Sequence, residues 1–148
     1  MTQTLYHQDF YAWTQQQAAL LQTEELEKLD LPNLIEEIEA MGKSQRKEVR
    51  SRLTVLLMHL LKWQFQPEHQ SRSWANTIRT QRREIDLELE DSPSLRREVP
   101  EMIGKAYPRA RSAAIEETGA LSSSAFPATC PWSVEQILDA EWLPTEVR

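Results

Sequence analysis

Cysteine, glycine and long apolar runs are scarce in this chain of 148 residues. The one cysteine, Cys130, cannot form an internal disulfide, which is typical of a reducing cytoplasm. The first residues show no basic patch followed by an apolar run, so they predict no secretory signal. The longest apolar run, residues 55–61, is interrupted by His59 and is too short to span a bilayer. We therefore expect a soluble, cytoplasmic protein without a membrane segment or a disulfide.

Sheet-forming patterns are also missing, because Val, Ile and Thr do not cluster in period-two alternation. The three glycines leave few turns, while Leu, Glu, Gln and Arg, which favour helices, are abundant. A chain of this length makes one domain, and its 40% hydrophobic content is enough for one core. The composition therefore predicts an all-α, single-domain bundle over residues 1–148, with five to six helices.

A long helix over about residues 33–65 is the centre of the predicted fold, because apolar residues recur there at helical spacing. The pattern lapses between Met41 and Val49, and a helix broken at Gly42 also fits it. We predict a continuous or gently kinked helix, since one glycine costs only about 1 kcal/mol relative to alanine. A proline-containing turn follows, and a second helix over about residues 72–90 packs antiparallel to the first.

Shorter segments complete the predicted bundle. Asp9 is placed to cap a first helix with its carboxylate. The dipeptide Ser92-Pro93 begins a later helix, because proline fits the first helical turn. Residues 119–131 form a loop that leads to a short C-terminal helix, which Ser133 begins with a capping box.

Charge is segregated along the chain, although the net charge is only −6. Residues 1–42 contain one lysine against eight acids, and residues 84–148 contain six cations against thirteen acids. Residues 43–83 contain ten cations against two acids. A basic middle between acidic flanks indicates either internal pairing or a polar surface for a partner.

The register of the predicted hairpin distinguishes cations that face an acidic residue from cations that face apolar residues. A turn about Glu68 places Arg50 level with Asp86 and Arg46 level with Glu90. We therefore expect these arginines to be neutralised inside the fold, although each exposed pair contributes only about 0–1 kcal/mol.

Three arginines of the second helix, Arg79, Arg82 and Arg83, come level with an apolar span of the first helix, residues 53–57. They must turn to solvent, to the acids at the start of the central helix, or to a partner. Aromatics beside cations at a helical corner form a ligand pocket or partner surface, or they close the end of the core. The predicted partner-binding candidates are Arg72, Arg79, Arg82, Arg83, Trp63 and Trp74.

Carboxylates and one histidine of the central helix suggest a metal site in principle. Glu36, Glu37, Glu39 and His59 are residue types that di-iron and di-manganese bundles use, but the repeated Glu-x-x-His spacing is missing. On a continuous helix Glu37 and His59 lie roughly 33 Å apart at about 1.5 Å per residue. Only a reversal of the chain direction at Gly42 would bring Glu37 and His59 together. We expect no metal and no cofactor: the acids complement the helix dipole, and His59 is a hydrogen-bonded core histidine.

Five blocks of the chain form a distinctive combination: DFYAWTQQQAALL (9–21), LDLPNLIEEIEAMG (29–42), LLMHLLKWQFQP (56–67), SRSWANTIRTQRREI (71–85) and DSPSL (91–95). Together they resemble the cyanobacterial family called domain of unknown function 29, over about residues 5–143. The resemblance implies a small all-helical protein with no assigned activity, cofactor or active site, so no catalytic residue is carried over. His69-Gln70 stands where the family pattern leads us to expect a basic residue.

The patterns favour a non-enzymatic interaction module that binds a protein partner or self-associates through its basic and aromatic helical face. One alternative is nucleic-acid binding by the same face, which the net charge of −6 disfavours. The other is a metal-dependent enzyme built on the carboxylates and His59. Glycine-rich phosphate loops, serine-nucleophile elbows and Cys/His zinc spacings are missing from the sequence.

Overall fold

The computed structural model describes residues 4–119 and 125–145. Regular structure in these residues is helical throughout, which confirms the all-α prediction. The elements are α1 (Leu5–Gln8), α2 (Phe10–Gln22), the 3-10 turn η1 (Leu26–Lys28), α3 (Leu31–Phe65), η2 (Pro67–His69), α4 (Arg72–Asp91), η3 (Pro93–Glu98), α5 (Val99–Thr118) and α6 (Val134–Leu138). None of the helices in the described residues combines the length and apolar character needed to cross a membrane.

Helix α3 is continuous from Leu31 to Phe65, as predicted. Pro32 occupies its first turn, where the missing N–H has no helical partner to lose. Gly42 lies inside the helix, and a Cβ atom added there would meet nothing within 4 Å. The chain divides into two compact units, residues 1–44 and 45–148, and α3 belongs to both. That all 148 residues form a single domain stays a prediction.

The first unit is organised around Asp30, at the start of α3. Its carboxylate accepts hydrogen bonds from the Trp13 indole at 3.0 Å and from the Asn33 amide at 2.8 Å. The Asn33 bond is the main reason why the pKa of Asp30 lies below its usual value. Its backbone N–H donates to the side chain of Gln17 at 2.8 Å. Asp9 caps α2 as predicted, since its carboxylate accepts from the Ala12 N–H at 3.0 Å.

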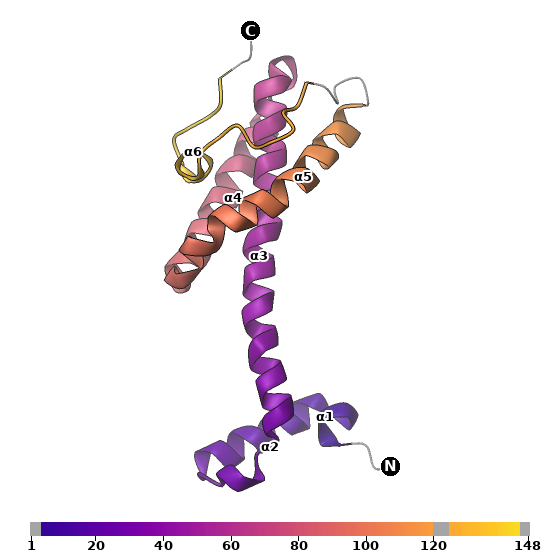
Figure 1. Ribbon diagram of the computed structural model, residues 1–148, viewed down its shortest axis with the longest axis vertical. Coiled ribbons are helices and arrows are strands. Elements are labelled where there is room, and N and C mark those ends of the chain that lie inside the picture. Colours follow the sequence, from indigo (N-terminus) through magenta and orange to yellow (C-terminus); the bar gives the residue numbers. More distant parts are fainter. Residues whose placement is uncertain (1–3, 120–124, 146–148) are drawn as a thin grey trace. The chain divides into compact units, whose positions relative to one another are not determined.

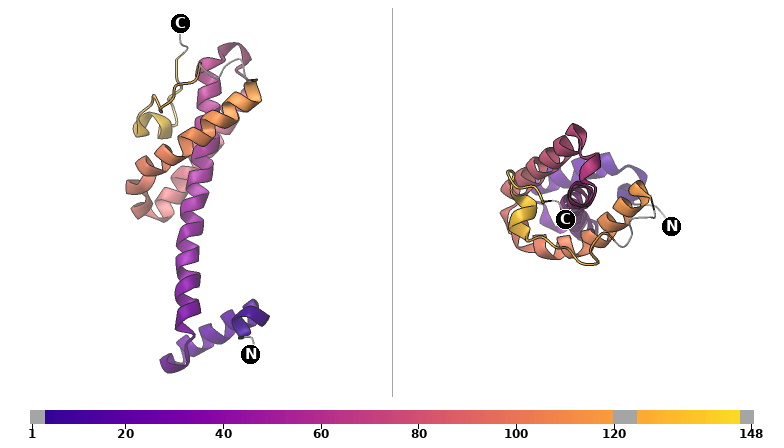
Figure 2. Two further views of the ribbon diagram at one scale, coloured as in Figure 1. Left: turned by 45° about the vertical axis from the view of Figure 1, so that its right-hand side comes forward. Right: turned by 90° about the horizontal axis from the view of Figure 1, so that it is seen from above.

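The second unit includes α4 and α5, which are labelled in Figure 1, and it contains the main core. There α4 runs back along the second half of α3, and α5 crosses this hairpin obliquely, as both views of Figure 2 show. Ser71 caps α4 by accepting the Trp74 N–H. Bonds from Gln45 to Ser92 and from Arg52 to Gln81 fix the antiparallel register of the hairpin. The large side chains at the centre of this core include Leu53, Leu56, Leu57, Leu60, Leu61, Ile78, Ile85, Val99 and Ile137.

The start of α5 differs from the prediction. The chain forms the 3-10 helix η3 after Ser92, and the α-helix begins only at Val99. Pro100 explains the delay, because a residue without an N–H fits the first turn of a helix and not its interior. Ser92 also makes no side-chain cap, since its hydroxyl accepts from the Gln45 amide at 2.6 Å instead.

The C-terminal segment lies against the core as a short helix. The capping box of Ser133 and Gln136 is present, which confirms that prediction. The expected loop over residues 119–131 falls partly outside the described residues. In its described part Phe126 is buried in the core and contacts the Phe65 ring edge-on.

Candidate functional site

Of the predicted basic and aromatic face, Trp63, Arg72 and Trp74 lie near the α3–α4 turn, and both tryptophans are partly buried. Trp63 packs against the core. Trp74 lies beneath the Lys62 ammonium, whose nitrogen is 4.8 Å from the ring centroid. Arg72, the first residue of α4, is exposed.

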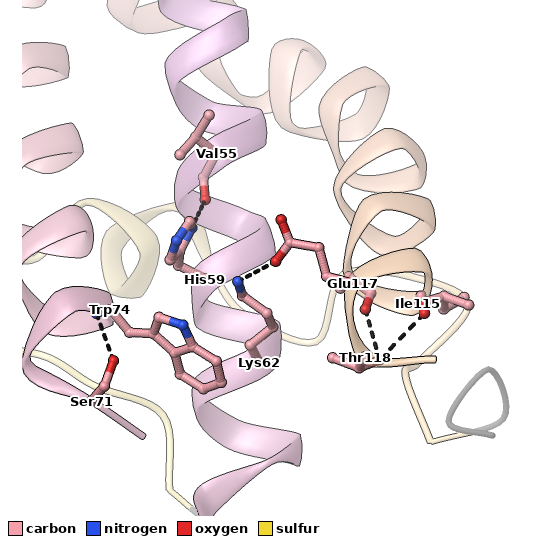
Figure 3. Close-up of polar contacts among 9 residues, drawn as sticks. Val55, His59, Lys62, Ser71, Trp74, Ile115, Glu117 and Thr118 are labelled. Carbon is pink, nitrogen blue, oxygen red and sulfur yellow. Dashed lines mark hydrogen bonds and ion pairs between the residues drawn. The ribbon is translucent and has the colours of Figure 1, made fainter. Parts of the chain in front are cut away.

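Lys62 is a buried cation that the sequence analysis did not single out (Figure 3). It is only 4% exposed, and its ammonium donates to Glu117 at 2.6 Å. Carboxylate and indole face together compensate for the loss of hydration. Lys62 is therefore held inside the fold, and its contacts connect α3 to α4 and α5.

Arg82 is placed differently from the prediction. We expected it to turn to solvent, to the acids of α3 or to a partner, whereas it is buried at 5% exposure. Its guanidinium donates to the backbone carbonyls of Ile137 at 2.8 Å, Trp142 at 2.6 Å and Gln136 at 3.2 Å. Burial lowers the pKa of Arg82 from its ordinary value. The side chain therefore holds the C-terminal segment against α4.

Arg79 and Arg83 remain at the surface. Arg79 donates to Asn76 on its own helix at 3.3 Å, and the Arg83 guanidinium lies 3.7 Å from the neighbouring Glu84. Both border a hollow of about 310 Å³, which is also lined by Arg82, Asp86, Leu138 and Ala140. Two cations of the predicted set thus face solvent beside a concave surface.

The basic waist of α3 forms ion pairs, but not those that were predicted. Arg46 pairs with Glu98 of η3 at 3.1 Å, and Arg52 pairs with Glu48 one turn away at 2.8 Å. In the described part of the chain no ion pair joins α3 to α4. The predicted pairs of Arg46 with Glu90 and of Arg50 with Asp86 are therefore wrong. The reason is that η3 brings Glu98 to the waist.

The candidates for a metal site do not come together. Helix α3 runs without a reversal through Gly42, so the reversal that would unite Glu36, Glu37 and Glu39 with His59 is not formed. No group of three or more His, Cys, Asp or Glu side chains gathers among the described residues. His59 is half-buried, and its Nδ1 atom lies 2.8 Å from the Val55 carbonyl (Figure 3). Desolvation lowers the pKa of His59.

Cys130 is half-buried, with its sulfur 3.6 Å from the Trp132 carbonyl. Burial raises the pKa of its thiol. The thiolate is the reactive form of cysteine. The surroundings of Cys130 therefore disfavour a nucleophilic role.

The first unit carries a feature that the sequence analysis missed, an apolar corner where α2 crosses the start of α3. It encloses a groove of about 460 Å³. The lining side chains are Phe10, Trp13, Thr14, Gln17, Ala18, Leu21, Leu34, Glu37, Ile38 and Met41. Glu37 is held at the edge by a hydrogen bond from the Tyr6 hydroxyl, which raises the pKa of Tyr6 to about 12. We call this set the apolar corner.

The side chains of the apolar corner are largely exposed. Ile38 is 61% and Met41 is 65% exposed, and Phe10 and Leu21 are also open to solvent. Further large side chains beside them, Leu31 and Ile35, are exposed as well. Within the described first unit, these side chains of α3 are therefore not covered by a neighbouring helix.

Comparison with known families agrees with the resemblance. The family model described as domain of unknown function DUF29 matches residues 5–143. The chain belongs to the DUF29 family. Neither a curated protein nor a solved structure matches this DUF29 protein. The family assignment thus supports the helical fold, but it assigns no activity to the chain.

A signal for the apolar corner was present in the sequence of this DUF29 protein. The apolar residues of α3 keep helical spacing through both units, but only the second unit has enough helices to cover them. The spacing alone does not show which apolar side chains stay open, because that depends on the crossing of α2 with α3.

Proposed function

We propose that this DUF29 protein is a non-enzymatic interaction module, and that the apolar corner docks a helix of another protein chain. The observation that supports the proposal is the exposure of Ile38 and Met41 inside a groove. Soluble proteins rarely leave large contiguous apolar patches open, and such patches mark interaction surfaces. At about 25 cal/mol for each Å² of apolar area, covering them drives association.

A helix is the occupant that this surface favours. Leu34, Ile38 and Met41 follow one another at intervals of four and three residues, so they form one stripe along α3. Amphipathic helices bind grooves of this kind by inserting residues at the same spacing. Because α2 bounds the groove at one side, the stripe and α2 together define the direction of the bound helix.

The basic face at the α3–α4 turn is proposed as a second contact for the same kind of partner. Its surface members are Arg72, Arg79 and Arg83, and the tryptophans of the predicted face, Trp63 and Trp74, are partly buried. Within the described part of the chain, Arg79 and Arg83 make polar contacts only with their own helix, and both border a hollow. Replacing Arg79 and Arg83 by glutamate is expected to weaken partner capture, and unchanged capture would remove this second contact from the proposal.

Site-specific photo-crosslinking tests the docking function. A benzophenone amino acid is introduced at Ile38 in the apolar corner, and at Leu87 of α4 as a matched control. Leu87 is also exposed, at 47%, but lies outside the corner. After irradiation in the native host cell, we expect a discrete protein adduct at position 38 and none at position 87. Mass spectrometry then identifies the attached chain.

A second substitution tests whether the adduct at position 38 forms in the groove. Met41→Glu in the chain that carries the probe at position 38 is expected to abolish the adduct, because it puts a charge into the apolar surface. Equal adduct yields at positions 38 and 87, or no adduct at 38, would contradict docking at the apolar corner.

A further inference from the structure

We infer that the helix bound by the apolar corner is a basic amphipathic helix, with lysines or arginines on both sides of its apolar stripe. This inference rests on the proposed docking function and adds the charge of the partner. Two observations support it. Acids flank the stripe of α3, and in the described part of residues 1–42 no unpaired lysine or arginine offsets them.

Acids lie on both sides of the stripe on α3. Successive residues of a helix are turned by about 100° from one another, so Glu37 and Glu39 project to either side of Ile38. Glu39 is exposed. Glu37 lines the groove and accepts a hydrogen bond from the Tyr6 hydroxyl, which holds it at the edge. A helix that covers Ile38 therefore has a carboxylate beside each of its flanks.

The other wall of the groove is uncharged, and acids stand at both of its ends. Helix α2 contains no Asp, Glu, Lys or Arg between Phe10 and Gln22. Asp9 precedes α2 and Glu24 follows it, and both are exposed. The apolar wall of α2 therefore contributes contact area without any positive charge.

The cations of the first unit do not offset these acids. Lys28 is the one lysine or arginine in the sequence of residues 1–42, and its ammonium lies 2.7 Å from the carboxylate of Glu25. Lys43 follows Met41 by two residues, which turns it by about 200° around the helix, towards the side opposite Met41. The charges that border the groove within the described first unit are therefore negative.

An acidic border around an apolar groove discriminates between occupants by their charge. Complementary charges speed encounter and fix the register of a bound helix, whereas like charges disfavour a wrong partner. A helix with acidic flanks would set its carboxylates against Glu37 and Glu39, and an anionic lipid surface is repelled in the same way. A basic amphipathic helix, by contrast, covers Ile38 and Met41 and neutralises the acids beside them.

Binding of a model helix by the purified full chain tests the inference. Two fluorescein-labelled peptides of about 18 residues carry the same leucine stripe at helical spacing and differ only in having lysine or glutamate at the remaining positions. We expect the Leu/Lys peptide to bind more tightly than the Leu/Glu peptide by about tenfold in Kd, measured by fluorescence anisotropy. Added salt should narrow the difference, because it screens exposed charges. Equal affinities of the two peptides, or no binding of the Leu/Lys peptide, would overturn the inference.

Matched variants locate the bound peptide. Glu37→Gln with Glu39→Gln removes two negative charges beside the stripe and keeps an acceptor for the Tyr6 hydroxyl. The pair should weaken binding of the Leu/Lys peptide by about fivefold in Kd. Glu88→Gln with Glu90→Gln is the same change at the same spacing on α4, outside the corner, and should leave the affinity unchanged. Equal weakening by the two pairs, or weakening by neither, would reject the acidic border as the binding determinant.

The crosslinking experiment separates this inference from the docking function. An adduct at position 38 whose attached segment is a helix with basic flanks supports both. An adduct with an acidic or uncharged segment, or with a second copy of this chain, keeps the docking function and overturns the basic partner. The absence of an adduct at position 38 overturns both, and binding of the chain to phosphatidylglycerol vesicles would then assign the corner to a lipid surface.

Discussion

At the scale of single residues, Arg82 shows where reasoning from sequence stops. The register of the hairpin placed it level with apolar residues of α3, and from that position it had no visible acidic partner. The structure supplies backbone carbonyls of the C-terminal segment instead. Carbonyl acceptors are the same for every residue type, so no sequence pattern marks them. Which segment returns to an arginine depends on the tertiary fold.

Replacing Arg82 by methionine tests this role. The change keeps the apolar stem but leaves up to three carbonyl groups without their donor. Because hydrogen bonds to charged groups contribute about 1.5–3 kcal/mol, we expect the free energy of unfolding to fall by about 3 kcal/mol. Urea denaturation measures it. Arg83→Met is the control, since Arg83 is exposed and should change stability by less than about 0.5 kcal/mol. Similar losses in the two variants would contradict the assignment.

His59 makes stability depend on pH in a narrow window. Desolvation lowers its pKa in the folded chain, so the unfolded chain binds the proton more strongly. Its contribution is therefore complete above the unfolded value, near 6.5, and is lost as pH falls towards the folded value. We expect His59→Gln to flatten the decline in unfolding free energy between pH 7 and pH 5, measured by urea titration. An unchanged slope would show that His59 is not the group responsible.

At the scale of elements, local chemistry predicted the helices well where a side chain acts within a few residues. Asp9 and Ser133 both cap the helices expected of them, because capping depends on spacing alone. The prediction failed at Ser92, whose hydroxyl is taken by Gln45 from a distant part of the chain. The exposure of Ile38 could not be predicted at all, because helical spacing identifies a stripe but not the neighbour that covers it.

The continuity of α3 through its waist predicts a stabilising substitution. Gly42 lies in the helix, is exposed and has open space at the Cβ position. Gly42→Ala should therefore raise the free energy of unfolding by about 0.5–1 kcal/mol, because alanine loses less backbone entropy. Gly104→Ala in α5 has the same open surroundings and should behave alike. Gly119→Ala should not stabilise, because Gly119 has a φ of 83°. A destabilised Gly42→Ala chain would mean that α3 is not helical at its waist.

At the scale of the whole molecule, the cations of α3 have partners different from those that the sequence predicted. Pairing between α3 and α4 was expected to neutralise the basic waist, but the waist turns partly to η3 and partly along its own helix. Lys43 and Lys47 are exposed and form no ion pair in the described chain. The lysines of the waist therefore stay at the surface of the described chain, and the sequence could not show this, because the partner of each cation depends on which segment the fold brings beside α3.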